Sequence, residues 1–147
     1  MLLMNTSPPP LHLPCPHCGA TNRLPVARID EAPNCGRCSQ PLLAGQPLDL
    51  DDSNFDSVAA ATRLPLVVDF WAAWCGPCQA MAPAFKQAGQ QLTGRALLVK
   101  VNSDDSPMLA ARFGIRSIPT LVKLQAGREV KRQSGALPAS AIVSFAG

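Results

Sequence analysis

The sequence has no long apolar run, no cluster of basic residues and no tyrosine among its 147 residues. No stretch approaches the roughly 20 apolar residues that a membrane-spanning helix needs, so we expect no association with a membrane. The 13 basic residues are scattered except at Lys131-Arg132, and the net charge is only +3. A nucleic-acid-binding surface is therefore excluded. Because no glycine-rich nucleotide loop occurs, we expect this chain to bind neither nucleotide nor flavin.

The first ten residues also lack the features of a secretion signal. They contain no basic residue, and a few apolar or small residues lead into a run of prolines. Export is therefore unsupported, and we predict a cytoplasmic protein. In that compartment cysteines serve as metal ligands or redox pairs more often than as structural disulfides.

Composition divides the chain into two regions. Residues 1–46 are rich in proline and cysteine and show little periodicity, whereas alternating strand-like and helix-like segments begin at Pro47. We predict a small amino-terminal domain with its linker over 1–46 and a larger domain over 47–147. A segment of that smaller size seldom holds a fold by its core alone, so we expect a metal or disulfide to stabilise it.

The larger region has the pattern of an α/β fold. The expected strands cover 48–50, 66–72, 96–101, 120–124 and 129–133, and the expected helices cover 53–62, 76–92, 107–113 and 138–146. Ser53 is the predicted N-cap of the first helix, and Pro83 should kink the second. Strands that alternate with helices and end in a hairpin predict a mixed sheet with helices on both faces.

The most informative motif is Trp74-Cys75-Gly76-Pro77-Cys78, which follows an apolar strand and begins a helix. Unpaired N–H groups and the positive end of the helix dipole stabilise a thiolate at that position. We expect Cys75 to be an exposed nucleophile at the carboxyl end of the strand. A metal site or a merely buried pair is the alternative, but Gly-Pro at a strand–helix turn favours a redox pair.

Four further cysteines form two Cys-x-x-Cys pairs separated by 16 residues, namely Cys15, Cys18, Cys35 and Cys38. This spacing is within the zinc pattern, and four thiolates make a closed tetrahedral site for one structural zinc ion. Gly19 and Gly36 fit the tight turns of such knuckles. Two disulfides or a second redox pair are the alternatives. His17 is interpreted as solvated or close to the metal, since four sulfurs already complete the shell.

Two segments, Phe70 to Cys78 and Gly114-Ile115-Arg116-Ser117-Ile118-Pro119-Thr120, resemble the thioredoxin family. The resemblance covers residues 47–147, and the four amino-terminal cysteines are similar to those of the two-domain, zinc-binding thioredoxins (thioredoxin two type). It implies a thioredoxin fold preceded by a zinc-ribbon-like domain. It also implies a protein-disulfide reductase, in which Cys75 attacks a disulfide of a protein substrate and Cys78 resolves the mixed disulfide. Thioredoxin reductase, with its own flavin and NADPH, would recycle the oxidised pair.

Asp69 is an anomaly in its apolar strand. Burial in a central strand raises the pKa of a carboxyl group, and such a group can accept the proton of Cys78. Lys100 is expected on the neighbouring strand, where it can pair with Asp69. The alternative makes Asp69 a rim residue and Lys100 a surface side chain; the resemblance favours the proton relay.

The resemblance also implies a substrate groove. Pro119 resembles the family's cis-proline, beside which the backbone of Ile118 would dock the substrate as an added strand. The expected lining of this shallow apolar groove is Trp74, Gly76, Pro77, Ile118, Gly135 and Ala136. Gly135 and Ala136 are alternatively only a turn before the last helix, and Trp71 is assigned to core packing.

Some features depart from the family or leave a second function open. Gln79 replaces the basic residue often found after the second active-site cysteine, and we expect this to weaken support for the thiolate. The alternative function is a redox-regulated zinc protein, in which oxidation ejects the metal and exposes a surface for unfolded chains. An oxidase or isomerase is disfavoured, because oxidising relatives usually carry histidine where this chain has Gly76-Pro77.

Overall fold

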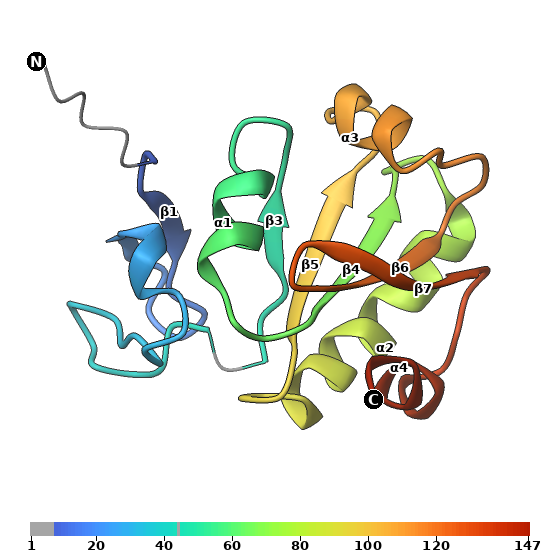
Figure 1. Ribbon diagram of the computed structural model, residues 1–147. Helices are drawn as coiled ribbons and strands as arrows, with labels where there is room; N and C mark the ends of the chain where they lie inside the picture. Colours follow the sequence, from blue (N-terminus) through green and yellow to red (C-terminus); the bar gives the residue numbers. More distant parts are fainter. Residues whose placement is uncertain (1–7, 44) are drawn as a thin grey trace, which may run out of the picture.

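The computed structural model describes residues 8–43 and 45–147 and has two parts, a small amino-terminal ribbon and a five-stranded sheet flanked by helices (Figure 1). The strand order is β3-β5-β4-β6-β7. The first three run parallel and the last two are antiparallel to their neighbours, so the sheet is mixed, as predicted. The strands are β3 (Leu48–Leu50), β4 (Leu66–Trp71), β5 (Leu97–Asn102), β6 (Thr120–Gln125) and β7 (Arg128–Ser134).

Helices cover both faces of this sheet. They are α1 (Phe55–Ala61), α2 (Gly76–Gln91), α3 (Pro107–Arg112) and α4 (Ala139–Ala146). Side chains of a strand alternate between faces: Val68 packs in one cluster with Phe55 of α1, whereas Val67 packs with Phe85 of α2 and Ile142 of α4. None of the helices within 8–43 and 45–147 is long and apolar enough to cross a membrane.

The start of α1 differs from the prediction. The helix begins at Phe55 after an N-cap at Asn54, so the assignment of Ser53 as the N-cap is wrong. Ser53 instead donates both its backbone N–H and its hydroxyl to the Asp51 carboxylate, at 2.9 and 2.5 Å. The Asp51 carboxylate therefore organises the preceding turn, and the N-cap falls one residue later than predicted. Within α2, Pro83 lies inside a helix that continues to Gln91.

The ribbon contains regular structure that the sequence analysis did not predict. Strands β1 (Leu11–Pro14) and β2 (Thr21–Leu24) form an antiparallel hairpin, and a short 3-10 helix, η1 (Val26–Arg28), follows. Strands of four residues are too short to show a clear alternation of apolar and polar positions. Their pairing is visible only once the chain has folded back on itself.

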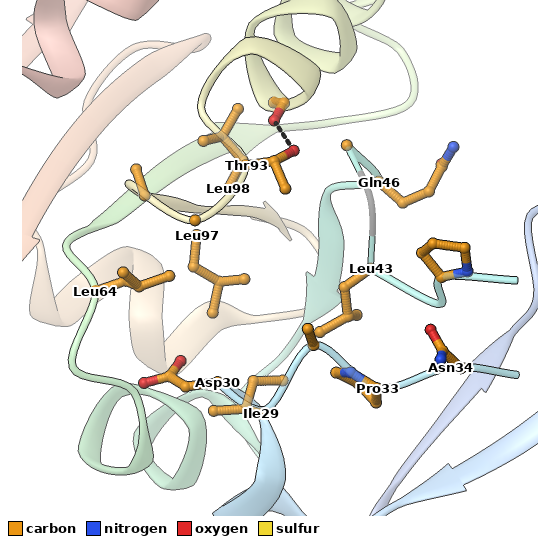
Figure 2. Close-up of a pocket in the computed structure, with 16 residues that line it drawn as sticks. Ile29, Asp30, Pro33, Asn34, Leu43, Gln46, Leu64, Thr93, Leu97 and Leu98 are labelled. Atoms are coloured by element: carbon orange, nitrogen blue, oxygen red, sulfur yellow. Dashed lines mark hydrogen bonds between the residues drawn. The ribbon is translucent and has the colours of Figure 1, made fainter.

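The ribbon packs directly against the larger part. Val26 and Ile29 are 2% and 3% exposed and belong to the same apolar cluster as Phe55 and Val58 of α1. Figure 2 shows Ile29 and Leu43 together with Leu64 and Leu97 around a pocket of about 230 Å³ at this junction. The sequence leaves open whether the ribbon docks or swings free; the shared core shows that it docks.

A carboxylate adds a polar contact to this interface. Asp30, just after η1, accepts hydrogen bonds from the hydroxyl of Thr62 at 2.6 Å and from the backbone N–H of Arg63 at 2.7 Å. Both donors follow the carboxyl end of α1. The ribbon therefore holds the segment that connects α1 to β4.

Candidate redox site and cysteine cluster

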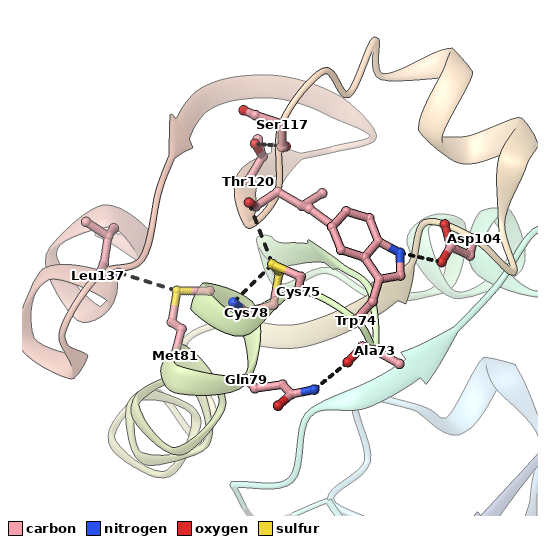
Figure 3. Close-up of a disulfide and its surroundings, with 11 residues drawn as sticks. Ala73, Trp74, Cys75, Cys78, Gln79, Met81, Asp104, Ser117, Thr120 and Leu137 are labelled. Carbon is pink, nitrogen blue, oxygen red and sulfur yellow. Dashed lines mark hydrogen bonds between the residues drawn. A yellow bond between two sulfur atoms is a disulfide. The ribbon is translucent and has the colours of Figure 1, made fainter.

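The strand–turn–helix unit brings two cysteines together at the start of α2. Cys75 is the N-cap residue of the helix, and its Sγ accepts a hydrogen bond from the backbone N–H of Cys78 at 3.2 Å. Pro77 lies in the first turn, where its missing N–H leaves no helical bond unmade. The two sulfurs form a disulfide, with their Cα atoms 5.3 Å apart (Figure 3).

The expected exposure of Cys75 is wrong. Cys75 and Cys78 are 4% and 3% exposed, and both belong to a small cluster with Ala72, against which Trp71 and Ile118 pack. The carbonyl oxygen of Ile118 lies 3.8 Å from Cys75 Sγ. The segment that precedes β6 therefore covers the disulfide, a long-range contact that no local sequence pattern reports.

A groove of about 500 Å³ leads to Cys75. Of the predicted lining residues, Trp74, Gly76, Pro77 and Ile118 lie in it, together with Ser103, Asp104, Ala110, Ile115, Arg116 and Ser117. Gly135 and Ala136 do not line this groove. Gly135 instead donates its backbone N–H to the carbonyl oxygen of Pro119 at 2.9 Å, beside the cis bond between Ile118 and Pro119.

Asp104 is a groove residue that the sequence analysis missed. Trp74 is 73% exposed, yet its indole N–H donates to the Asp104 carboxylate at 2.9 Å (Figure 3). This bond orients the largest exposed side chain of the groove. The available signal was the position of Asp104 just after β5, because the carboxyl ends of parallel strands in an open sheet meet at the same edge.

Asp69 lies in the centre of the sheet and not at its rim. It is 1% exposed, and neither carboxylate oxygen has a hydrogen-bond partner among the described residues. Burial raises the pKa of Asp69 to about 7, against an opposing influence of Lys100. Lys100 is its register partner on β5, with its Nζ 4.5 Å from the centroid of the Trp71 ring. The carboxyl group therefore titrates near neutral pH, the range in which thiol chemistry takes place.

The four amino-terminal cysteines converge, and their sulfur atoms all lie within 4.8 Å of one another. Between the two pairs, Cys15 and Cys38 sulfurs are 3.6 Å apart and Cys18 and Cys35 sulfurs 3.7 Å apart, and all four are free of disulfides. Zn–S bonds of about 2.3 Å in a tetrahedron place sulfurs about 3.8 Å apart. The donor set therefore fits a four-coordinate zinc ion. His17 is exposed and lies outside the cluster.

Backbone donors surround the sulfurs. Cys35 Sγ accepts N–H groups from Arg37 at 3.3 Å and Cys38 at 3.5 Å, and the Asn22 side-chain amide at 3.4 Å. The N–H of Cys38, then the amide of Asn22 and the N–H of Arg37, lower the pKa of Cys35 to about 6. Hydrogen bonds of this kind favour the thiolate form that ligates a metal.

The two knuckles share one backbone pattern. In the first, Gly19 donates its N–H to the carbonyl oxygen of Cys15; in the second, Ser39 donates to that of Cys35, both at 2.9 Å. Gly19 has φ of 77° and Ser39 of 67°. Gly36 lies in the turn of the second knuckle, residues 36–38, as expected, but it is not among the residues with positive φ. The left-handed position of the second knuckle falls on Ser39, which pays a steric cost that glycine avoids.

Comparison with known proteins agrees with this geometry. Residues 46–147 match the family model described as thioredoxin. The chain is 44% identical to thioredoxin C-3 of Corynebacterium nephridii over 123 residues, which cover 84% of each protein. The chain belongs to the thioredoxin family. A thioredoxin of Haemophilus influenzae is 41% identical over 98 residues, 67% of this chain and 92% of that protein.

The other comparisons extend to the fold and to the ribbon. Chloroplastic thioredoxin z has a similar solved structure, with a TM-score of 0.63 and 29% identity over 69% of this chain and 91% of its own. Residues 14–40 match the family model for the amino-terminal region of thioredoxin 2. This thioredoxin thus combines a four-cysteine ribbon with a thioredoxin fold, and its Cys75–Cys78 pair makes it a thiol-disulfide oxidoreductase.

Proposed function

We propose that this thioredoxin reduces disulfides of protein substrates in the cytoplasm and is recycled by thioredoxin reductase. The observation that supports this most strongly is the Cys75–Cys78 disulfide at the start of α2, beside a groove with an exposed Trp74. An extended substrate segment docks beside Ile118 and the cis-linked Pro119.

The exchange proceeds in two steps. The Cys75 thiolate attacks one sulfur of the substrate disulfide and expels the other as a thiolate, so that a mixed disulfide forms. The Cys78 thiolate then attacks Cys75 Sγ and releases the second substrate sulfur. Two electrons pass to the substrate, and the pair ends as the observed disulfide. Thioredoxin reductase returns two electrons from NADPH.

Asp69 supplies the proton transfer. Its buried carboxylate accepts the proton of Cys78, directly or through water, as Cys78 becomes the attacking group. Its pKa of about 7 allows it to take up and release this proton near neutrality. Lys100, on the adjacent strand, favours the ionised form of Asp69 and so assists its return to the base form.

The ribbon has a structural role. We assign residues 1–46 to a zinc-binding domain with its linker and residues 47–147 to the thioredoxin domain. Cys15, Cys18, Cys35 and Cys38 would hold one zinc ion, and four thiolates leave no open position for a substrate. When bound, the ion supplies folding free energy to a region with few apolar side chains.

The test is reduction of insulin in the presence of NADPH and thioredoxin reductase. Cys75→Ser should abolish turnover, because serine cannot form the mixed disulfide. Cys78→Ser should also stop turnover but accumulate the mixed disulfide, which non-reducing gels and mass spectrometry detect. Equal turnover by wild type and Cys75→Ser would contradict the proposal.

A redox-regulated zinc protein is the second candidate, and the exposure of Cys18 favours it. Cys15 and Cys35 are buried, however, which supports a structural site. A peroxide titration that follows zinc release and thiol content separates the two. A sensor loses zinc at oxidant levels that leave insulin reduction intact, whereas a structural ribbon retains it.

A further inference from the structure

A row of three charged residues crosses the sheet beside the redox site. In the parallel register, Asp49 of β3 pairs with Lys100 of β5, and Lys100 pairs with Asp69 of β4. Cα partners in adjacent strands are about 4.8 Å apart. Lys100 therefore stands between two carboxylates, one on each side.

All three side chains belong to the same face of the sheet. The neighbours of Asp49 in β3, Leu48 and Leu50, pack in the apolar cluster on the α1 side. Successive side chains of a strand alternate, so Asp49 lies on the opposite face, which α2 and α4 cover near Asp69. Exposure falls along the row: Asp49 is exposed, Lys100 half-buried and Asp69 buried.

Asp49, Lys100 and Trp71 also line one polar pocket of about 320 Å³. The Lys100 ammonium lies over the Trp71 ring, 4.5 Å from its centroid, and no ion pair fixes it to either carboxylate among the described residues. Neither carboxylate therefore holds the cation in an ion pair, and one carboxylate lies on each side of it in the register.

We infer that Asp49 is a positioning residue that competes with Asp69 for the Lys100 ammonium. Asp49 draws the cation outward, which leaves Asp69 with less compensation for its charge and keeps it a better proton acceptor. The inference rests on the proposed role of Asp69 in proton transfer and adds a residue that controls it. Every strand residue involved is placed by register, so the competition is built into the sheet.

Two other carboxylates line the same pocket, Asp51 and Asp105. The Asp51 carboxylate already accepts two hydrogen bonds from Ser53. Asp105 lies in the loop after β5 and has no register partner in the sheet. Neither is placed beside Lys100 as Asp49 is, so Asp105→Asn is a matched control that removes one charge from the same pocket.

The remaining groups on this face do not replace Lys100. The Cys75–Cys78 disulfide, at the start of α2, does not titrate, and Lys86 of the same helix is exposed. Helix α4 contains no ionisable side chain. Lys123 of β6 donates its ammonium to the carbonyl oxygen of Gly147 at 3.1 Å, at the end of α4. Its partner on β7, Lys131, binds the same oxygen at 3.0 Å.

The test is a titration of the Asp69 carboxyl carbon by NMR in the full-length oxidised protein. Asp49→Asn should increase the acid dissociation constant of Asp69 about threefold, because the Lys100 ammonium then compensates the negative charge of Asp69 alone. Asp105→Asn should change it less than half as much. In a Lys100→Met background, Asp49→Asn should leave the acid dissociation constant of Asp69 almost unchanged. A double-mutant cycle of the two substitutions measures this.

Two results would overturn the inference: an equal effect of Asp105→Asn, or an Asp49→Asn effect that persists in the Lys100→Met background. Persistence would mean direct repulsion between the carboxylates rather than competition for Lys100. The cycle needs no catalysis, so it separates this inference from the proposed function. If Asp69→Asn left insulin reduction unchanged, the proton-relay role would fail while the cycle could still hold.

Discussion

The ribbon and the thioredoxin domain use the same Cys-x-x-Cys spacing for different purposes. In each pair the first sulfur accepts the N–H of the second cysteine: at Cys15 and Cys35 this distance is 3.5 Å, and at Cys75 it is 3.2 Å. The pairs differ at the residue directly before the second cysteine. His17 and Arg37 donate a second N–H to their sulfurs, whereas Pro77 has none to give.

The structure after each pair differs as well. The ribbon pairs end in tight turns, so four sulfurs from two knuckles face a common centre. The third pair continues into the sixteen-residue helix α2, which directs Cys78 back toward Cys75. Identical spacing therefore supports metal coordination or disulfide exchange, and the residue between the cysteines and the following backbone decide which.

Removing one zinc ligand should have the largest effect, and that effect should be confined mainly to the ribbon. Cys35→Ser should reduce bound zinc from one ion to less than about a tenth per chain and unfold the ribbon, since structural zinc contributes on the order of 10 kcal/mol. Insulin reduction should fall by no more than about threefold, because the groove is built from residues 74–118 of the other part. Metal analysis and the insulin assay measure both.

The reciprocal control is Cys75→Ser, which should keep its zinc and lose its activity. A zinc-free Cys35→Ser protein with no activity would show that the two regions are not separable.

Asp69 gives the thioredoxin domain a pH dependence of its own. Its pKa is raised from about 3.9 in the unfolded chain to about 7, so its stabilising contribution is complete below about pH 4 and is lost as the pH rises through 7. The free energy of unfolding of Asp69→Asn relative to wild type should therefore increase by about 4 kcal/mol between about pH 4 and about pH 8. Urea denaturation across this range measures it.

The same titration should appear in catalysis. The rate at which Cys78 resolves the mixed disulfide should rise with pH through about 7 in wild type, and fall by about 100-fold at neutrality in Asp69→Asn. Stopped-flow kinetics checks this. A pH-independent stability difference would contradict the assignment of a raised pKa.

Removing a contact at the interface between the two regions should have a smaller effect than a substitution at either site. Asp30→Ala removes the acceptor for Thr62 and Arg63 and should reduce the free energy of unfolding by about 1 kcal/mol, since these bonds are exposed to solvent. Glu31→Ala is the control, because Glu31 only forms an exposed pair with Arg28 and should change stability by less than about 0.5 kcal/mol. Equal losses of unfolding free energy in Asp30→Ala and Glu31→Ala would contradict the interface role of Asp30.

The smallest effect is expected at the left-handed residue of the second knuckle, Ser39. Ser39→Gly should stabilise the ribbon by about 0.5–1 kcal/mol, because it gives the second knuckle the glycine that the first has at Gly19. Gly19→Ser should destabilise by a similar amount. Zinc competition with a chromophoric chelator and thermal unfolding report both changes; a destabilised Ser39→Gly would contradict the strain argument.

Local patterns were enough to predict the main elements. The apolar run of β4 and the period of α2 are strong over their length, and the Cys-x-x-Cys spacings identify both cysteine sites. The short ribbon strands and the position of Asp104 depend on contacts between distant segments. The same holds for the burial of Cys75 under Ile118, and for the contact between Ile29 and α1.

In this protein two sulfurs are placed to exchange electrons, while four others are placed to hold a metal. Zinc and free thiols should be counted together in the full-length protein after reduction and again after mild oxidation by a disulfide substrate. We predict one zinc ion per chain in both states and the loss of two thiols, which peptide mapping assigns to Cys75 and Cys78. Zinc release with the loss of more than two thiols would contradict it.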